Sequence, residues 1–201
     1  MTMKTAIKIS PKDNGQRMSL DDFEDAEAQE GYLYELGRGV VVVTGIPNPR
    51  WFLLSNAIKL QLFGYQTAHP DEIFAIGTGA ECKILLAGLQ SERHPDIGVY
   101  KTSPTADDSS AWSTWIPELV IEIVTPGSEQ RDYVEKREEY LQFGVREYWI
   151  IDAAKSQMIA LQRSRGEWKE FKIAPPAMYT TPLLPGFEFN IAAVFKANSG
   201  K

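Results

Sequence analysis

The fold is decided by one stretch of the chain, Pro117–Asp152, which has the sequence PELVIEIVTPGSEQRDYVEKREEYLQFGVREYWIID. Two short runs within it, Glu118–Val124 and Glu147–Asp152, are rich in apolar residues and predict strands. The first is apolar at nearly every position, which is typical of a strand buried on both faces. The polar segment between the runs predicts a helix that extends to about Phe143 and ends at Gly144, because glycine commonly stops a helix. Strand, helix and strand in this order favour a mixed α/β fold.

Turn residues and apolar periodicity predict further elements on both sides of this stretch. They are a short acidic helix from Ser19, a hairpin of Tyr32–Glu35 and Val40–Thr44, a helix over Trp51–Phe63, strands at about Gly79–Leu86 and Pro95–Lys101, a hairpin of Met158–Arg163 and Trp168–Ile173, and a terminal strand with a short helix that ends near Phe195. We therefore expect a central mixed β-sheet that is flanked by helices and carries extra β-hairpins.

The length of 201 residues fits one domain, and an apolar content of 43% is enough to fill a core. We expect a loose N-terminal arm over residues 1–17, a single domain over 18–196 and a tail over 197–201. No apolar run approaches the ~18 residues that a membrane span needs, and the N-terminus lacks the apolar core of a signal peptide. The single cysteine, Cys82, suits a reducing compartment, so we expect a cytoplasmic protein.

The net charge of −6 argues at first against a nucleic-acid partner, because phosphate binding depends on lysine and arginine. The acids are concentrated, however. Ser19–Glu35 has seven acids and no base, which leaves +1 for the rest of the chain. Lys155–Lys172 has five bases and two acids, and a solvated strand pair explains this patch at least as well as a phosphate track does. Charge therefore neither supports nor excludes nucleic acid.

Two carboxylates are candidates for a metal site. Glu122 lies within the apolar run Glu118–Val124, where a buried carboxylate needs a cation, hydrogen-bond donors or a proton. The alternative is a salt-bridged glutamate, or one that water still reaches. Asp96 follows Pro95 at the start of another predicted strand, although Pro-Asp alone is a common turn dipeptide. Two carboxylates at the ends of neighbouring strands would repel each other, and a hard cation such as Mg²⁺ or Mn²⁺ between them would relieve that repulsion.

Lys136 is the third candidate. It lies at the edge of the apolar face of the predicted helix, so its ammonium group could reach the carboxylates while its stem packs. The alternative is an exposed ion pair with Asp132, four residues earlier on the same helix. Spacing alone leaves the two interpretations about even.

These pieces together resemble a known family. Pro95-Asp96, the strand PELVIEIVTP, the helix RDYVEKREEYLQFGV and the strand EYWIID resemble the PD-(D/E)xK nuclease superfamily and, more closely, the bacterial Uma-two family of unknown function. MSLDDF, YELGRG and LPGFEFNIAAVF extend the resemblance from about Met18 to Phe195. It implies a restriction-endonuclease-like core.

The resemblance also implies roles for individual residues. Asp96 and Glu122 would hold the metal, and Lys136 would be a catalytic lysine that has migrated to the helix. Glu35 corresponds to a glutamate in the family's hairpin, and we count it and Asp132 as supporting residues. Two positions depart from the pattern: Val124 occupies the usual place of the lysine, and Trp51 stands where many relatives carry a histidine.

The remaining candidates are weaker. His69, His94 and Cys82 lack the spacing of zinc ligands, and Cys82 in mid-strand is more typical of a core residue than of a nucleophile. Glu81 could lie near the carboxylates or at a strand edge. Trp112 and Trp115 could stack on bases, but loop tryptophans more often cover a core.

Two functions are compatible with these observations. The first is a nuclease that uses Mg²⁺ or Mn²⁺ to hydrolyse phosphodiester bonds of DNA, with Asp96, Glu122 and Lys136 as catalytic residues. The second is a weak or inactive module on the same scaffold that binds nucleic acid or protein, which Trp51 and the acidic balance favour. We expect DNA to be the partner if the enzyme is active. We expect no association with a membrane and no organic cofactor. A homodimer is compatible with the sequence.

Overall fold

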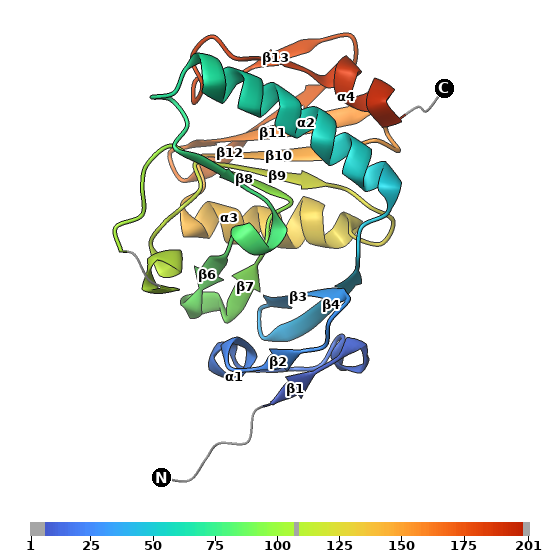
Figure 1. Ribbon diagram of the computed structural model, residues 1–201, viewed down its shortest axis with the longest axis vertical. Helices are drawn as coiled ribbons and strands as arrows, with labels where there is room; N and C mark the ends of the chain where they lie inside the picture. Colours follow the sequence, from blue (N-terminus) through green and yellow to red (C-terminus); the bar gives the residue numbers. More distant parts are fainter. Residues whose placement is uncertain (1–6, 107–108, 199–201) are drawn as a thin grey trace.

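The computed structural model describes residues 7–106 and 109–198 and is organised around a six-stranded sheet (Figure 1). The strand order is β12-β11-β10-β9-β8-β5. The strands are β5 (Ala75–Gly77), β8 (Ile97–Tyr100), β9 (Leu119–Ile123), β10 (Glu147–Asp152), β11 (Gln157–Ser164) and β12 (Glu167–Ile173). Only β9 and β10 pair in parallel among these strands, and the helical segment that contains α3 forms the crossover between them. The sheet is therefore mixed, as the sequence predicted.

Helices cover both faces of this sheet (Figure 1). α2 (Pro49–Ala68) and α4 (Ile191–Asn198) lie on one face, and α3 (Lys136–Phe143) lies on the other. Side chains alternate along β9, so that Leu119, Ile121 and Ile123 pack toward α2. Val120 packs toward α3. Glu122 shares the α3 face by the same alternation, which places a carboxylate inside a two-sided core.

A second, smaller sheet lies beyond α3, and the N-terminal segments cover its far side (Figure 1). Its order is β4-β3-β7-β6. The strands are β3 (Tyr32–Gly37), β4 (Val40–Gly45), β6 (Ile84–Leu86) and β7 (Ser91–Arg93), and the N-terminal elements are β1 (Lys8–Ile9), α1 (Leu20–Glu24) and β2 (Glu27–Ala28). Because α3 is enclosed between the two sheets, polar side chains on this helix can face β3 and β7 as well as β9.

The structure corrects two expectations in this region. Residues 7–17 do not form a loose arm, because β1 pairs with β2 and Ile9 is buried with Leu20 and Phe23; residues 1–6 lie outside the described part. The predicted strand Gly79–Leu86 is a 3₁₀ turn, η2 (Gly79–Glu81), followed by β6. The Glu81 carboxylate accepts hydrogen bonds from the backbone N–H and the hydroxyl of Thr78, which turns the chain before β6 can start.

Several short elements were absent from the expectations. They are β5 and β7, the hairpin strand β13 (Met178–Thr180) that pairs with β14 (Glu188–Asn190), and the 3₁₀ turns η1 (Pro11–Asp13), η3 (Ala87–Leu89) and η4 (Ser109–Ser113). The predicted tail over 197–201 begins inside α4, which extends to Asn198, and residues 199–201 lie outside the described part. No helix among residues 7–106 and 109–198 is long and apolar enough to span a bilayer.

The helix before β10 starts with an unusual turn. Residues Arg131–Glu135 form a π-helical turn, η5, that runs directly into α3. The backbone N–H of Lys136 therefore donates to the carbonyl of Arg131, five residues earlier. Such wide turns are rare and occur frequently at functional sites.

Candidate functional site

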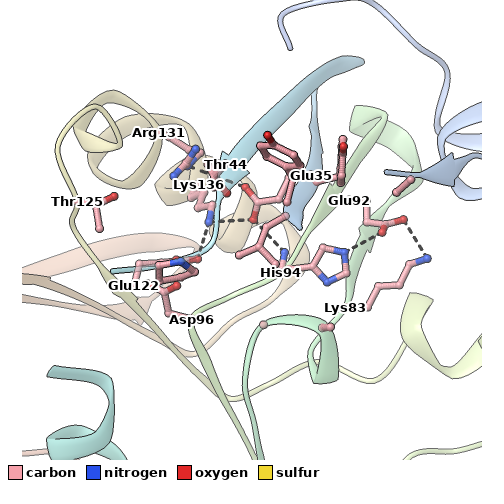
Figure 2. A pocket seen from close by; sticks show the side chains of 18 of the residues that line it. Glu35, Thr44, Lys83, Glu92, His94, Asp96, Glu122, Thr125, Arg131 and Lys136 are labelled. Atoms are coloured by element: carbon pink, nitrogen blue, oxygen red, sulfur yellow. Dashed lines mark hydrogen bonds and ion pairs between the residues drawn. The ribbon is translucent and has the colours of Figure 1, made fainter. Parts of the chain in front are cut away.

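Asp96 and Glu122 lie side by side on the α3 face of the large sheet (Figure 2). β8 and β9 are antiparallel with Ile97 opposite Ile121, so one more step in this register places Asp96 opposite Glu122. The Asp96 Oδ2 atom accepts a hydrogen bond of 2.7 Å from the backbone N–H of Ile123. The structure thus brings the two predicted metal ligands to one point on adjacent strands.

Lys136 reaches the same point from the helix (Figure 2). Its Nζ atom lies 2.8 Å from Glu122 Oε1 and 3.1 Å from Glu35 Oε1, and its side chain is only 3% exposed. The hydroxyl of Tyr140, one turn further along α3, donates to the same Glu122 oxygen at 2.5 Å. The alternative of an exposed ion pair with Asp132 does not fit this burial or these contacts.

Glu35 comes to the site from β3 in the small sheet. In addition to Lys136, its carboxylate accepts a hydrogen bond of 3.0 Å from the backbone N–H of His94 and one of 3.4 Å from Arg93 Nη1. Burial raises the pKa of Glu35, but the charges of Lys136, Arg93 and Arg131 outweigh it and lower the pKa to about 2. Glu35 is therefore ionised at neutral pH and holds Lys136 in place.

Asp132 is buried next to this cluster, at the start of η5. Its Oδ2 atom accepts a hydrogen bond of 2.5 Å from the hydroxyl of Ser128. Its Oδ1 atom is buried and has no hydrogen-bond partner in the described part of the chain, since Arg131 Nε is 3.6 Å away. A buried carboxylate oxygen without a donor is unfavourable, and a cation or water in the adjacent cavity would satisfy it.

The charges of the cluster do not balance, and the pKa values of the two predicted ligands move accordingly. Burial raises the pKa of Asp96 to about 6, although Lys136, the Ile123 N–H and a hydrogen-bonding interaction with the Trp51 side chain act in the opposite direction. Burial also raises the pKa of Glu122, and the nearby carboxylates of Asp96, Asp132 and Glu35 add to this against Lys136. Both carboxylates therefore bind a proton more readily than a free side chain does, and another cation bound at this place would compete with that proton.

A cavity of about 430 Å³ opens onto the cluster. Its polar wall includes Glu35, Asp96, Glu122, Arg131, Asp132 and Lys136. Trp51, at the position where the resemblance implies a histidine, also lines the cavity. The volume lies in the range of small-molecule binding sites.

These residues fit a divalent ion that keeps several of its water molecules. Asp96 and Glu122 offer hard oxygen ligands on one face, and Mg²⁺ in proteins is commonly held by one or two carboxylates. Over residues 7–106 and 109–198, no group of three His, Cys, Asp or Glu side chains is arranged to hold an ion by itself. An ion at this place would therefore depend on two protein carboxylates and on water or substrate oxygens for its remaining ligands.

Arg93 is a key residue that sequence reasoning missed. It is fully buried in β7, and its Nε and Nη2 atoms contact the two carboxylate oxygens of Glu139 in α3 at 2.6 and 3.1 Å. Together with its bond to Glu35 it ties the small sheet to α3. The segment Ser91–Arg93 has no apolar pattern, and its position directly before the Pro95-Asp96 motif was the only available signal.

Replacing Gly37 by alanine is expected to disturb this tie. A Cβ atom at Gly37 would lie 2.4 Å from Arg93 Nη2, and the guanidinium cannot retreat without loosening its contacts with Glu139. We expect a loss of about 1–3 kcal/mol of stability, measured by urea unfolding. Gly45→Ala in the same hairpin is the control, because nothing lies within 4 Å of that Cβ position. Equal stability of the two variants would contradict the prediction.

The other candidates have structural roles. His94 approaches the Cys82 carbonyl with Nδ1 and Glu92 with Nε2, and burial raises the pKa of the Cys82 thiol to about 11. Trp115 stacks on Tyr100 and donates its indole N–H to a backbone carbonyl. The remaining weak candidates keep to local contacts: Glu81 caps a turn, His69 stacks on Tyr65, and Trp112 packs near Trp115.

Comparisons with known proteins agree with this architecture. The family described as "Uma2: Putative restriction endonuclease" matches residues 20–192. A solved structure described as "a putative nuclease belonging to DUF820 from Anabaena variabilis" is similar with a TM-score of 0.71 and 18% sequence identity, covering 90% of this chain and 99% of that one. At this identity the likeness concerns the fold. A comparison with curated proteins found no match. Because the family match spans most of the chain, the chain belongs to the Uma2 family, which is described as a "Putative restriction endonuclease" family.

Proposed function

We propose that this protein is a divalent-metal-dependent nuclease that hydrolyses phosphodiester bonds of DNA at the cavity next to α3. The observation that carries the proposal is the convergence of three side chains: Asp96 directly before β8, Glu122 in β9 and Lys136 in α3, with Lys136 Nζ 2.8 Å from Glu122. The family and the fold support a nuclease. The metal, the DNA substrate and the roles of the residues are our inference.

Asp96 and Glu122 are the proposed ligands of Mg²⁺ or Mn²⁺. When bound, such an ion polarises a phosphoryl oxygen and lowers the pKa of bound water. The two carboxylates have the charge and the position to hold it. Burial raises the pKa of both, and neighbouring carboxylates add to this.

Lys136 and Glu35 form the rest of the machinery. The Lys136 ammonium, held between Glu122 and Glu35, is the donor that orients the attacking water or stabilises the charge that develops on the phosphate. The neighbouring carboxylates raise the pKa of Lys136 against the effect of burial, so it acts as a cation and not as a base. Glu35, in the small sheet, positions Lys136. Asp132 is a further carboxylate at the polar wall of the cavity.

One observation favours a second function. Trp51 stands where many relatives carry a histidine, and its side chain interacts with Asp96. A bulky indole at this point would suit a module that binds nucleic acid or protein without cleaving it. The cleavage experiment below separates the two functions.

The proposal predicts metal-dependent cleavage that fails when either ligand is changed. We expect the parent protein to nick a supercoiled plasmid in Mn²⁺ and not in EDTA. Asp96→Asn and Glu122→Gln should each reduce the rate of nicking by at least about 100-fold. This exceeds the effect typical of residues that only hydrogen-bond to a metal ligand. Asp71→Asn, an exposed acid outside the cavity, is the control. Metal-dependent binding without nicking would favour the second function, and equal nicking by all variants would contradict the assigned site.

A further inference from the structure

We propose that Arg131 is a second phosphate-binding residue that contacts the oxygens of the phosphodiester next to Lys136. This inference rests on the proposed nuclease function and adds a substrate contact that the motif does not include. It begins with the π-helical turn η5. Residues five apart on an α-helix point about 140° away from each other. The wider turn, closed by the bond from the Lys136 N–H to the Arg131 carbonyl, brings these two side chains to the same side.

Figure 2 shows the result: Arg131 and Lys136 lie next to each other above Glu122, at the polar wall of the cavity. Both approach Glu35, Lys136 at 3.1 Å from Oε1 and Arg131 Nε at 4.0 Å from Oε2. The two cations therefore flank the point where a phosphate that enters the cavity would meet the carboxylates.

Arg131 differs from the other cations of the cavity in how it is held. Lys136 and Lys83, the two lysines that line the cavity, have carboxylate oxygens at 2.8 and 2.9 Å. The nearest carboxylate oxygen in the contacts of Arg131 is Asp132 Oδ1, at 3.6 Å from Nε. Nε is buried and has no hydrogen-bond partner within residues 7–106 and 109–198.

A guanidinium with an unused, buried N–H at the wall of a cavity is suited to an anion with planar pairs of oxygens. Arginine binds phosphate through two parallel N–H···O bonds, and this geometry is lost in lysine although the charge remains. A phosphodiester would supply the acceptor that Nε lacks. It would also balance the positive charge when a divalent ion occupies the carboxylates.

The test is nucleic-acid binding by variants of the full chain that cannot cleave. In the Asp96→Asn background, a fluorescein-labelled DNA oligonucleotide is titrated at several salt concentrations and its anisotropy is measured. Arg131→Gln should weaken binding by about tenfold or more and reduce the slope of log K against log salt by about one. Arg131→Lys should recover the slope but only part of the affinity. With Asp96 restored, Arg131→Gln should raise KM for cleavage more than it lowers kcat.

Arg137→Gln is the matched control. Arg137 lies on the same helix, but it does not line the cavity. Its Nη1 atom is 2.9 Å from the Glu170 carboxylate. The Arg137→Gln variant should therefore keep the salt slope of the parent. Equal affinity and slope for Arg131→Gln and Arg137→Gln would overturn the inference. A lower Tm for Arg131→Gln with an unchanged slope would overturn it as well, since Arg131 would then only stabilise Glu35. A parent that binds and cleaves no DNA would overturn the proposed function itself.

Discussion

Replacing Lys136 by methionine is expected to destabilise the protein by about 3–5 kcal/mol, the usual cost of removing one partner from a buried ion pair. The methionine can fill the space of the lysine stem, but it leaves the carboxylates of Glu122 and Glu35 without the ammonium group that lies within 3.1 Å of both. This loss is a large fraction of the 5–15 kcal/mol by which domains are usually stable. Urea unfolding at pH 7 measures it.

The double variant Lys136→Met, Glu122→Gln separates charge from packing. Glutamine keeps an acceptor for the Tyr140 hydroxyl and removes the uncompensated charge, while Glu35 retains Arg93 and the His94 N–H. We expect the double variant to be more stable than Lys136→Met alone, which is the non-additivity expected of residues in contact.

An exposed ion pair provides the control for Lys136→Met. Lys155 lies 2.9 Å from Asp152 but its side chain is 55% exposed, so Lys155→Met should cost at most about 1 kcal/mol. If Lys136→Met costs no more than this, the buried pair between Lys136 and Glu122 is not formed as described.

The sequence was sufficient to predict the strands that carry Asp96 and Glu122. A carboxylate in an otherwise apolar strand is a rare combination, and the alternation of side chains fixes the face to which it points. Lys136 was predicted at the edge of the apolar face of an α-helix. Nothing in the sequence predicted the π turn Arg131–Glu135 before it, and such turns are rare.

What the sequence did not predict is how the second sheet completes the site. β7 consists of Ser91, Glu92 and Arg93, and a strand of three polar residues shows no periodicity. Arg93 is nevertheless fully buried, because Glu139 and Glu35 from two other elements compensate its charge. Such compensation between residues 46 and 58 positions apart is invisible to any local pattern. The buried N-terminal residue Ile9 was missed for the same reason, since its partners lie in α1 and β3.

Asp96→Asn is expected to change the dependence of stability on pH. In the parent, the pKa of Asp96 is raised to about 6, above the ~3.9 of an unfolded chain. The stability that belongs to this group is thus fully present below about pH 4 and is lost as the pH rises through 6. Asparagine does not titrate and can still accept the hydrogen bond from the Ile123 N–H. The free energy of unfolding of the variant should therefore rise relative to that of the parent between pH 4 and 7. At pH 7 the variant should be more stable by up to about 3 kcal/mol, at 1.36 kcal/mol per pKa unit.

A divalent ion should reverse this order of stability between the parent and Asp96→Asn. The ion would relieve the repulsion between the carboxylates in the parent, which the substitution has already removed in the variant. Millimolar Mn²⁺ or Mg²⁺ at pH 8 should raise the Tm of the parent, by the equivalent of about 2.7 kcal/mol if the ion is present at 100 times its Kd. The increase should shrink as the pH falls, because protons compete first for Glu122 and then, around pH 6, for Asp96. Asp96→Asn should lose the increase, whereas Asp71→Asn, an exposed acid away from the cavity, should keep it.

A thermal-shift series over pH 5–8 with and without Mn²⁺ measures both effects together. Equal metal-induced shifts in the parent and in Asp96→Asn would exclude Asp96 as a ligand of the proposed ion, and the absence of any shift in the parent would contradict a divalent-metal site at these carboxylates.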